Sequence, residues 1–279
     1  MFINDVKNVI PEKNIICVSP HYDDFLFFLG GYVLEMKEKD LLKTKKFTNI
    51  STFSRSNYQE RDVAGNKDRS LKRVQFATGI RFIEDLQCLD DLLGAHAYCY
   101  RVMGEEESQV RGKVFREGEG EMEMAYGSYE TMDRYDWAIL NRIQACIMEI
   151  AVQEDTAIVL PLAMKGHIDH FIVREAGVRT IAELGGSVRA TFYFAEDKPY
   201  AGLLNDEETQ QTTDFIEKYR LEDVGYPHHP EEVLKLAFAH YPSQVDDVYH
   251  LGIAARDEQL KEYYGAGGHC DRMFKFKSI

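Results

Sequence analysis

Short apolar runs rich in β-branched residues alternate along the chain with longer segments of helical spacing, and this alternation most constrains the fold. The runs predict strands at residues 15–19, 48–53, 157–161 and 189–194. The longer segments predict helices at residues 25–39, 61–78, 134–153 and 171–184. Such alternation favours an α/β fold in which helices cover both faces of a mainly parallel sheet. In folds of this kind, ligands bind beyond the carboxyl ends of the strands.

Two parts of the chain depart from the alternation. Residues 103–128 are rich in Glu and Gly and show no sustained period, which predicts a solvated loop or hairpin; a mobile flap over the site is the functional alternative. Residues 206–279 predict helices and loops, with helices at 207–219, 230–239 and 255–264. Because no repeat or linker interrupts the chain, we expect a single domain over residues 1–279.

Composition narrows the classes of function. The formal net charge of -14 disfavours binding to nucleic acid or to an anionic membrane. The first predicted strand is not followed by GxGxxG, which disfavours an NAD-binding protein. The five cysteines include no CxxC pair, and the first residues lack the pattern of a signal peptide. We therefore expect a cytoplasmic protein with a small-molecule substrate, and a homo-oligomer stays open.

A His and two Asp residues follow the first predicted strand. His21, Asp23 and Asp24 lie in the turn between that strand and the next helix. An imidazole and a carboxylate three residues apart are acceptable ligands for an ion such as zinc, and Asp23 is free to act on a metal-bound water. Helix capping is the alternative, because Asp favours the first positions of a helix. Capping explains one Asp more readily than two beside a His.

A second His/Asp cluster follows the strand predicted at residues 157–161. His167, Asp169 and His170 come after a short Gly-containing loop and open the next helix. Since both clusters follow strands of one parallel sheet, they can meet at the same edge. His170 would then complete a set of two His and one Asp, which leaves a coordination position open for water. Taken alone, this motif also fits a surface loop whose Asp caps a helix.

The paired motifs PHYDD at 20–24 and GHIDH at 166–170 resemble those of the LmbE-like, PIG-L-type deacetylase family. Further similar segments are STFSRSNY at 51–58, FAEDKPY at 194–200 and YPSQ at 241–244, so the resemblance covers residues 15 to 245. It implies a Rossmann-like fold and one divalent metal ion, for which we expect zinc. It also implies hydrolysis of an N-acetyl group, typically on an N-acetylglucosamine compound, by attack of a metal-bound water.

The resemblance also implies roles for single residues. The metal ligands would be His21, Asp24 and His170. Asp23 would take a proton from the water and deliver it to the leaving amine, and His167 would stabilise the oxyanion. Asp169 would orient His167 or another imidazole rather than bind metal.

Four more residues are candidates for binding the substrate, and each has a structural alternative. Arg55 suits hydroxyl or phosphate acceptors, but an ordinary ion pair would also explain it. Tyr58 could stack on a sugar ring or simply pack against the protein. Glu196 and Asp197 belong to the acidic stretch of the resemblance, and a turn through Lys198–Pro199 is the alternative.

The first motif departs from the family pattern, which is usually His-Pro-Asp-Asp-Glu. Tyr22 stands in place of the Pro and Phe25 in place of the Glu. Neither position is a metal ligand in the family, so we expect these changes to affect the pocket rather than metal binding. Two rival functions remain: a metal amidase acting on a non-sugar N-acyl substrate, and a non-catalytic carbohydrate- or nucleotide-binding protein.

Overall fold

The structure is a computed structural model that describes residues 1–62, 64–113, 115–116 and 124–277. Within these residues the chain forms a seven-stranded sheet of order β3–β2–β1–β6–β7–β9–β8 and a separate two-stranded sheet, β4–β5. The strands are β1 (Asn14–Ser19), β2 (Lys46–Ser51), β3 (Tyr98–Val102), β4 (Phe115–Arg116), β5 (Met124–Ala125), β6 (Thr156–Pro161), β7 (Thr191–Ala195), β8 (Glu222–Pro227) and β9 (Cys270–Lys275).

The central part of the large sheet is parallel, as the sequence predicts. The strands β3, β2, β1, β6 and β7 pair in parallel, and β9 is antiparallel to both β7 and β8. All four predicted strands are present, as β1, β2, β6 and β7. Every residue of β6 is buried, which is what a strand covered on both faces requires.

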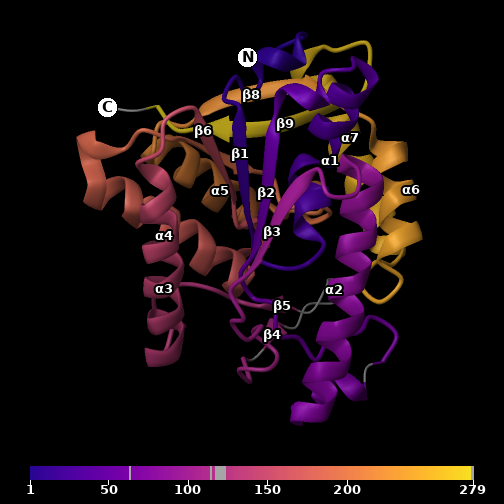
Figure 1. Ribbon diagram of the computed structural model, residues 1–279, viewed down its shortest axis with the longest axis vertical. Helices are drawn as coiled ribbons and strands as arrows, with labels where there is room; N and C mark the ends of the chain where they lie inside the picture. The colour runs from indigo at the N-terminus through magenta and orange to yellow at the C-terminus, as the bar shows by residue number, and fades with distance from the viewer. Residues whose placement is uncertain (63, 114, 117–123, 278–279) are drawn as a thin grey trace.

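Helices cover both faces of the sheet (Figure 1). Helices α1 (Asp24–Glu38), α2 (Leu71–Leu93) and α6 (Pro230–His240) lie on one side, and α3 (Arg134–Ala151) and α4 (Ile168–Leu184) lie on the other. Each side has its own buried apolar cluster. The remaining helices are α5 (Asp206–Lys218) and α7 (Asp247–Tyr264). Among the residues described, none of the helices is apolar enough over a sufficient length to cross a bilayer.

The second helix lies further along the chain than its predicted range of 61–78. It begins after Ser70, whose Oγ accepts a hydrogen bond from the backbone N of Arg73, and it ends before Gly94, whose φ is 97°. The polar residues before it form a loop instead, in which the Arg73 guanidinium donates to Asp62 at 2.7 Å. Side chains such as Asp and Asn compete with helical hydrogen bonds in this way.

Residues 206–279 contain strands as well as helices, so the expectation of helices and loops alone is wrong. Strands β8 and β9 complete one edge of the sheet. The charged residues of β9 obscured its strand pattern, because Asp271 and Arg272 interrupt the apolar residues. Tertiary partners satisfy both charges: Lys198 Nζ is 2.5 Å from Asp271, and Arg272 Nε is 2.7 Å from Glu196.

Residues 103–128 are predicted to form a solvated loop or hairpin, and this prediction holds for only part of the segment. Strands β4 and β5 pair antiparallel, and residues 114 and 117–123 lie outside the described residues. The earlier part of the segment is interior, because Glu105, Glu107 and Ser108 are buried. Sequence period alone misses such a segment, since its burial comes from single polar contacts rather than from a repeated apolar face.

Gly252 in α7 makes a close contact that predicts a large effect of one methyl group. A Cβ there would lie 2.3 Å from the carbonyl oxygen of Pro199, and backbone cannot move aside as a flexible side chain can. We expect Gly252→Ala to lower the free energy of unfolding by about 1–3 kcal/mol or more, measured by urea denaturation. Gly79→Ala in α2 is the control, because no atom lies within 4 Å of its added Cβ. Equal stability of the two variants would contradict this packing.

Candidate metal centre and active site

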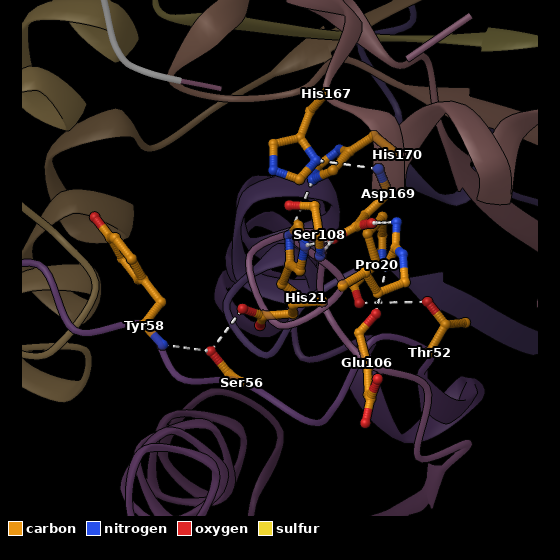
Figure 2. A network of polar contacts seen from close by, with 12 residues as sticks. Pro20, His21, Thr52, Ser56, Tyr58, Glu106, Ser108, His167, Asp169 and His170 are labelled. Carbon is orange, nitrogen blue, oxygen red and sulfur yellow. Dashed lines mark hydrogen bonds and ion pairs between the residues drawn. The ribbon is translucent and has the colours of Figure 1, made fainter. Parts of the chain in front are cut away.

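Two imidazoles and one carboxylate from the two motifs meet beyond the ends of β1 and β6. His21 Nδ1 lies 3.2 Å from His170 Nε2, and Asp24 Oδ2 lies 3.5 Å from each of these nitrogens. Ligand atoms about 2.0–2.1 Å from one tetrahedral ion are about 3.4 Å apart. The three atoms could therefore hold one zinc-sized cation with little movement. Figure 2 shows His170 next to His167, with His21 and Asp169 close by.

A carboxylate behind each imidazole sets which nitrogen faces this triangle. His21 Nε2 lies 3.1 Å from Asp169 Oδ2, and His170 Nδ1 hydrogen-bonds to Asp197 Oδ1. A ring N–H donated to a carboxylate leaves the other nitrogen of the neutral ring with a free lone pair. Partners of this kind are usual behind metal-binding histidines. The imidazole that Asp169 contacts is that of His21.

Asp197 is expected to bind substrate, but it lies behind His170 instead. Its Oδ2 also accepts a hydrogen bond from the backbone N of Met164 at 2.9 Å. This bond holds the loop before α4, where Ala163 and Lys165 adopt left-handed backbone conformations with φ of 60° and 56°. Each such residue costs of the order of 1–3 kcal/mol and persists only where the surroundings impose it. Asp197 is therefore part of the framework that positions His170.

The buried carboxylates make the triangle electrostatically short of positive charge. Burial lowers the pKa of His170, but Asp24 and Asp197 outweigh it, and the pKa rises to about 9. The pKa of His21 is also raised, because Asp169 and other acids outweigh burial. Burial raises the pKa of Asp24 to about 6, although both imidazoles oppose this. In each case the surroundings favour an added cation, whether a proton or a metal ion.

The side chain of Asp23 makes no capping hydrogen bond, although Asp23 is the N-cap residue of α1. It is Asp24 that accepts a bond from a turn backbone, from His21 N at 2.6 Å. The carboxylate of Asp23 instead faces the cavity and accepts a hydrogen bond from Tyr249 Oη at 3.3 Å. Helix capping by its side chain therefore does not explain why an Asp stands at position 23.

His167 lies beside the other two imidazoles, with ring centroids 4.9 Å from His21 and 5.2 Å from His170. Burial lowers its pKa well below the usual value, so the ring is neutral. Because His167 Nδ1 accepts the backbone N–H of Asp169 at 3.2 Å, its Nε2 carries the proton. Ligand atoms of the three imidazoles lie within 4.8 Å of one another. We nevertheless favour Asp24 as the third ligand, since both nitrogens of His167 are engaged or protonated.

A cavity of about 90 Å³ opens onto these groups. Besides the motif residues, its walls include Tyr58, Tyr200, Tyr249, Arg81, Gln109 and Gln244. Gln109 Oε1 is buried and has no hydrogen-bond partner among the described residues. The cavity thus combines aromatic walls with polar groups that could bind hydroxyl or amide groups. Tyr58, expected from the sequence, is one of these wall residues.

Two other expected substrate-binding residues lie elsewhere. Arg55 has a side chain that is 45% exposed and pairs with Glu106 at 3.1 Å, and it does not line the cavity. Glu196 is fully buried and is held by the guanidinium groups of Arg256 and Arg272. For Arg55 the alternative of an ordinary ion pair describes the geometry better than substrate contact does. For Glu196 neither substrate contact nor the expected turn describes it, because its carboxylate is buried between two arginines.

The two departures in the first motif point away from the metal triangle. Tyr22 donates its hydroxyl to the carbonyl oxygen of Ser54 at 2.7 Å and is buried. Phe25 packs in the apolar core, with its ring centroid 6.3 Å from that of Phe47. Both side chains therefore pack within the protein around the site.

Sequence reasoning missed the polar wall formed by Arg81, Glu107 and Gln244. Arg81 is buried in α2, where it donates to Glu107, to Ser56 and, at 2.7 Å, to Gln244 Oε1. One signal was present: Arg81 stands four residues after the buried Ala77, on the core-facing stripe of its helix. A charged residue on such a stripe indicates a buried polar network.

Glu196 offers a test of its framework role. Burial raises its pKa, but Arg256 and Arg272 outweigh burial, and the pKa falls to about 2. We expect Glu196→Gln to lower the unfolding free energy at pH 7 by about 3–5 kcal/mol, because two largely buried guanidinium groups lose the buried carboxylate that they share. A lowered pKa stabilises the fold above the ordinary carboxyl pKa of about 4.3, and this contribution is lost as the pH falls toward 2.

The difference in unfolding free energy between the wild type and Glu196→Gln should therefore become smaller as the pH is lowered. Chemical denaturation at several pH values would measure it. Unchanged stability together with a raised KM would instead restore Glu196 as a substrate contact.

A search of solved structures finds deacetylases. The zinc inhibited form of the teicoplanin deacetylase Orf2 has a TM-score of 0.65 at 19% identity, covering 95% of this chain and 98% of that one. The A40926 pseudoaglycone deacetylase Dbv21 gives 0.62 at 19%, covering 96% and 99%. The N,N'-diacetylchitobiose deacetylase from Pyrococcus horikoshii gives 0.51 at 12%, covering 98% and 87%.

Neither the scan against protein-family models nor the search of curated proteins finds a match. The likeness to the solved structures extends over nearly the whole chain, at identities too low to compare single functions. It bears out the fold that the paired motifs implied: this chain has the fold of the LmbE-like, PIG-L-type deacetylases.

Proposed function

We propose that the protein is a metal-dependent hydrolase that removes an N-acetyl group from an N-acetylated amino sugar or a similar small molecule. The observation that supports this most is the triangle of His21 Nδ1, Asp24 Oδ2 and His170 Nε2, with separations of 3.2–3.5 Å, next to the Asp23 carboxylate that faces the same cavity. Two imidazoles and a carboxylate suit zinc, and three protein ligands leave a position open.

A divalent cation bound there would polarise the amide carbonyl and make a water molecule more acidic. The protein groups supply the proton transfers. Asp23 would accept a proton from the attacking water and pass it to the amide nitrogen, which must leave as an amine. His167 would donate its Nε2–H to the oxyanion that forms on the carbonyl oxygen. The products are acetate and the free amine.

The cavity supports a small, polar substrate. Tyr58, Tyr200 and Tyr249 offer ring faces, and Gln109 Oε1 is free to accept a hydrogen bond from a hydroxyl or amide group. The cavity, of about 90 Å³, opens beside the metal triangle, so these side chains lie next to the place where the amide would react. The deacetylases of similar fold include one named for diacetylchitobiose, which is consistent with an acetylated sugar.

The role of Asp23 can be separated from metal binding. We expect Asp23→Asn to keep its zinc and to lose about 10²- to 10⁴-fold in kcat, because the amide cannot transfer the proton. Acetate released from N-acetylglucosamine and its oligomers would be measured, alongside zinc content. Asp206→Asn, at an exposed first-turn position of α5, is the matched control. A zinc-loaded Asp23→Asn enzyme of full activity would refute this role.

Replacing His170 should have the opposite effect on metal binding from replacing Asp23. We expect His170→Ala to bind zinc much more weakly and to lose activity with it, because one of three ligands is removed. His250→Ala, in an exposed part of α7, should leave both unchanged. Competition with a chelating dye would measure zinc affinity.

The same assays on the wild-type protein separate the rival functions. Protein that binds sugars but releases no acetate would favour the non-catalytic alternative. Acetate released from non-sugar amides alone would favour the amidase.

A further inference from the structure

Arg111 is a buried arginine from the Glu- and Gly-rich segment, and it lies directly behind the proposed metal centre. Its side chain is only 1% exposed. Its Nη2 donates to Asp169 Oδ1 at 2.7 Å and its Nε donates to Asp136 Oδ1 at 3.0 Å. A third bond runs from Nη1 to the carbonyl oxygen of Glu106, and the guanidinium lies 4.9 Å from the ring centre of Phe53.

These contacts reach the metal triangle through Asp169. One oxygen of Asp169 faces Arg111, and the other is shared by His21 Nε2 at 3.1 Å and by the backbone N of Ser108 at 2.9 Å. Figure 2 shows Asp169 to one side of His21 and Ser108. Asp169 is fully buried, so its rotation is set by these donors rather than by water. The orientation of His21 therefore depends on how firmly Arg111 holds Asp169.

The charges around Asp169 also make the orientation of His21 depend on Arg111. Asp169 shares its surroundings with Glu107, and both are buried carboxylates near His21. A buried carboxylate without a cationic partner is costly and tends to take up a proton or move toward another donor. The planar guanidinium binds Asp169 and Asp136 at once, which a lysine cannot do with the same geometry. Arg111 thus keeps Asp169 available to His21.

We propose that Arg111 is a positioning residue for the metal centre: through Asp169 it fixes the ring of His21 with Nδ1 toward Asp24 and His170. The inference rests on the proposed function, since it assumes that this triangle binds a divalent cation. It also gives residues 103–128 a role that differs from the flap considered above. Part of that segment acts as a fixed internal support.

The test compares zinc affinity in Arg111→Met, Arg111→Lys and a matched control, Arg142→Met. Arg142 also anchors this segment, since it binds Glu105 at 2.6 Å, but it is 48% exposed and does not contact Asp169. Zinc affinity would be measured by competition with a chelating dye. The absorption spectrum of the Co²⁺-substituted protein would report the geometry of the ligands, which general destabilisation would not alter.

We expect Arg111→Met to weaken zinc binding about 10- to 100-fold and to change the Co²⁺ spectrum, as loss of a ligand's partner usually does. Arg111→Lys should recover part of the affinity, and Arg142→Met should stay within about threefold of wild type. If Arg111→Met does not fold, Arg111→Lys tests the inference, and we expect it to bind zinc more weakly than the wild type does.

Wild-type affinity and an unchanged spectrum in the folded Arg111 variants would overturn the inference alone. So would an equal loss of affinity in Arg142→Met, because the effect would then belong to the segment as a whole. Wild-type protein that binds neither zinc nor Co²⁺ would overturn the proposed function, and this inference with it.

Discussion

The parallel pairing of β1 with β6 is the constraint on which the candidate site depends. Cys17 pairs with Val159, so the two strands end side by side although about 140 residues separate them. Each strand is followed by a short loop that contains a His, and Asp24 and His170 lie in the first turns of α1 and α4, the helices that follow. These two helices lie on different faces of the sheet. The pairing therefore brings His21 and His170 within 3.2 Å of each other.

Electrostatics then determines what this junction can bind. Three buried carboxylates surround the two imidazoles. Asp169 and Asp197 are within hydrogen-bonding distance of His21 and His170 respectively, and Asp24 Oδ2 is 3.5 Å from His170 Nε2. Arginines compensate two of the carboxylates around the triangle, since Arg111 binds Asp169 and Arg81 binds Glu107. Asp24 has no arginine or lysine partner in the part of the chain that the structure describes. A divalent cation at the triangle would supply the missing positive charge.

The sequence predicts most accurately those parts of the molecule where local chemistry and strand order agree. The four central strands, the helices α1, α3 and α4, and the meeting of the two motifs all follow from period and from the rule about strand ends. The sequence predicts less accurately those segments whose polar residues are buried by tertiary partners. The start of α2, the strands β8 and β9, and the interior part of residues 103–128 all depend on such contacts.

The amino-acid sequence by itself determined the parallel α/β core and the set of groups able to bind a metal, because both follow from local period and from residue type next to strand ends. Only the tertiary structure decided which carboxylate serves which imidazole. Asp197 proved to hold His170, Glu196 to join two arginines, and Arg111 to support Asp169. These pairings join residues tens of positions apart, and their geometry exists only once the sheet and its loops have closed around them.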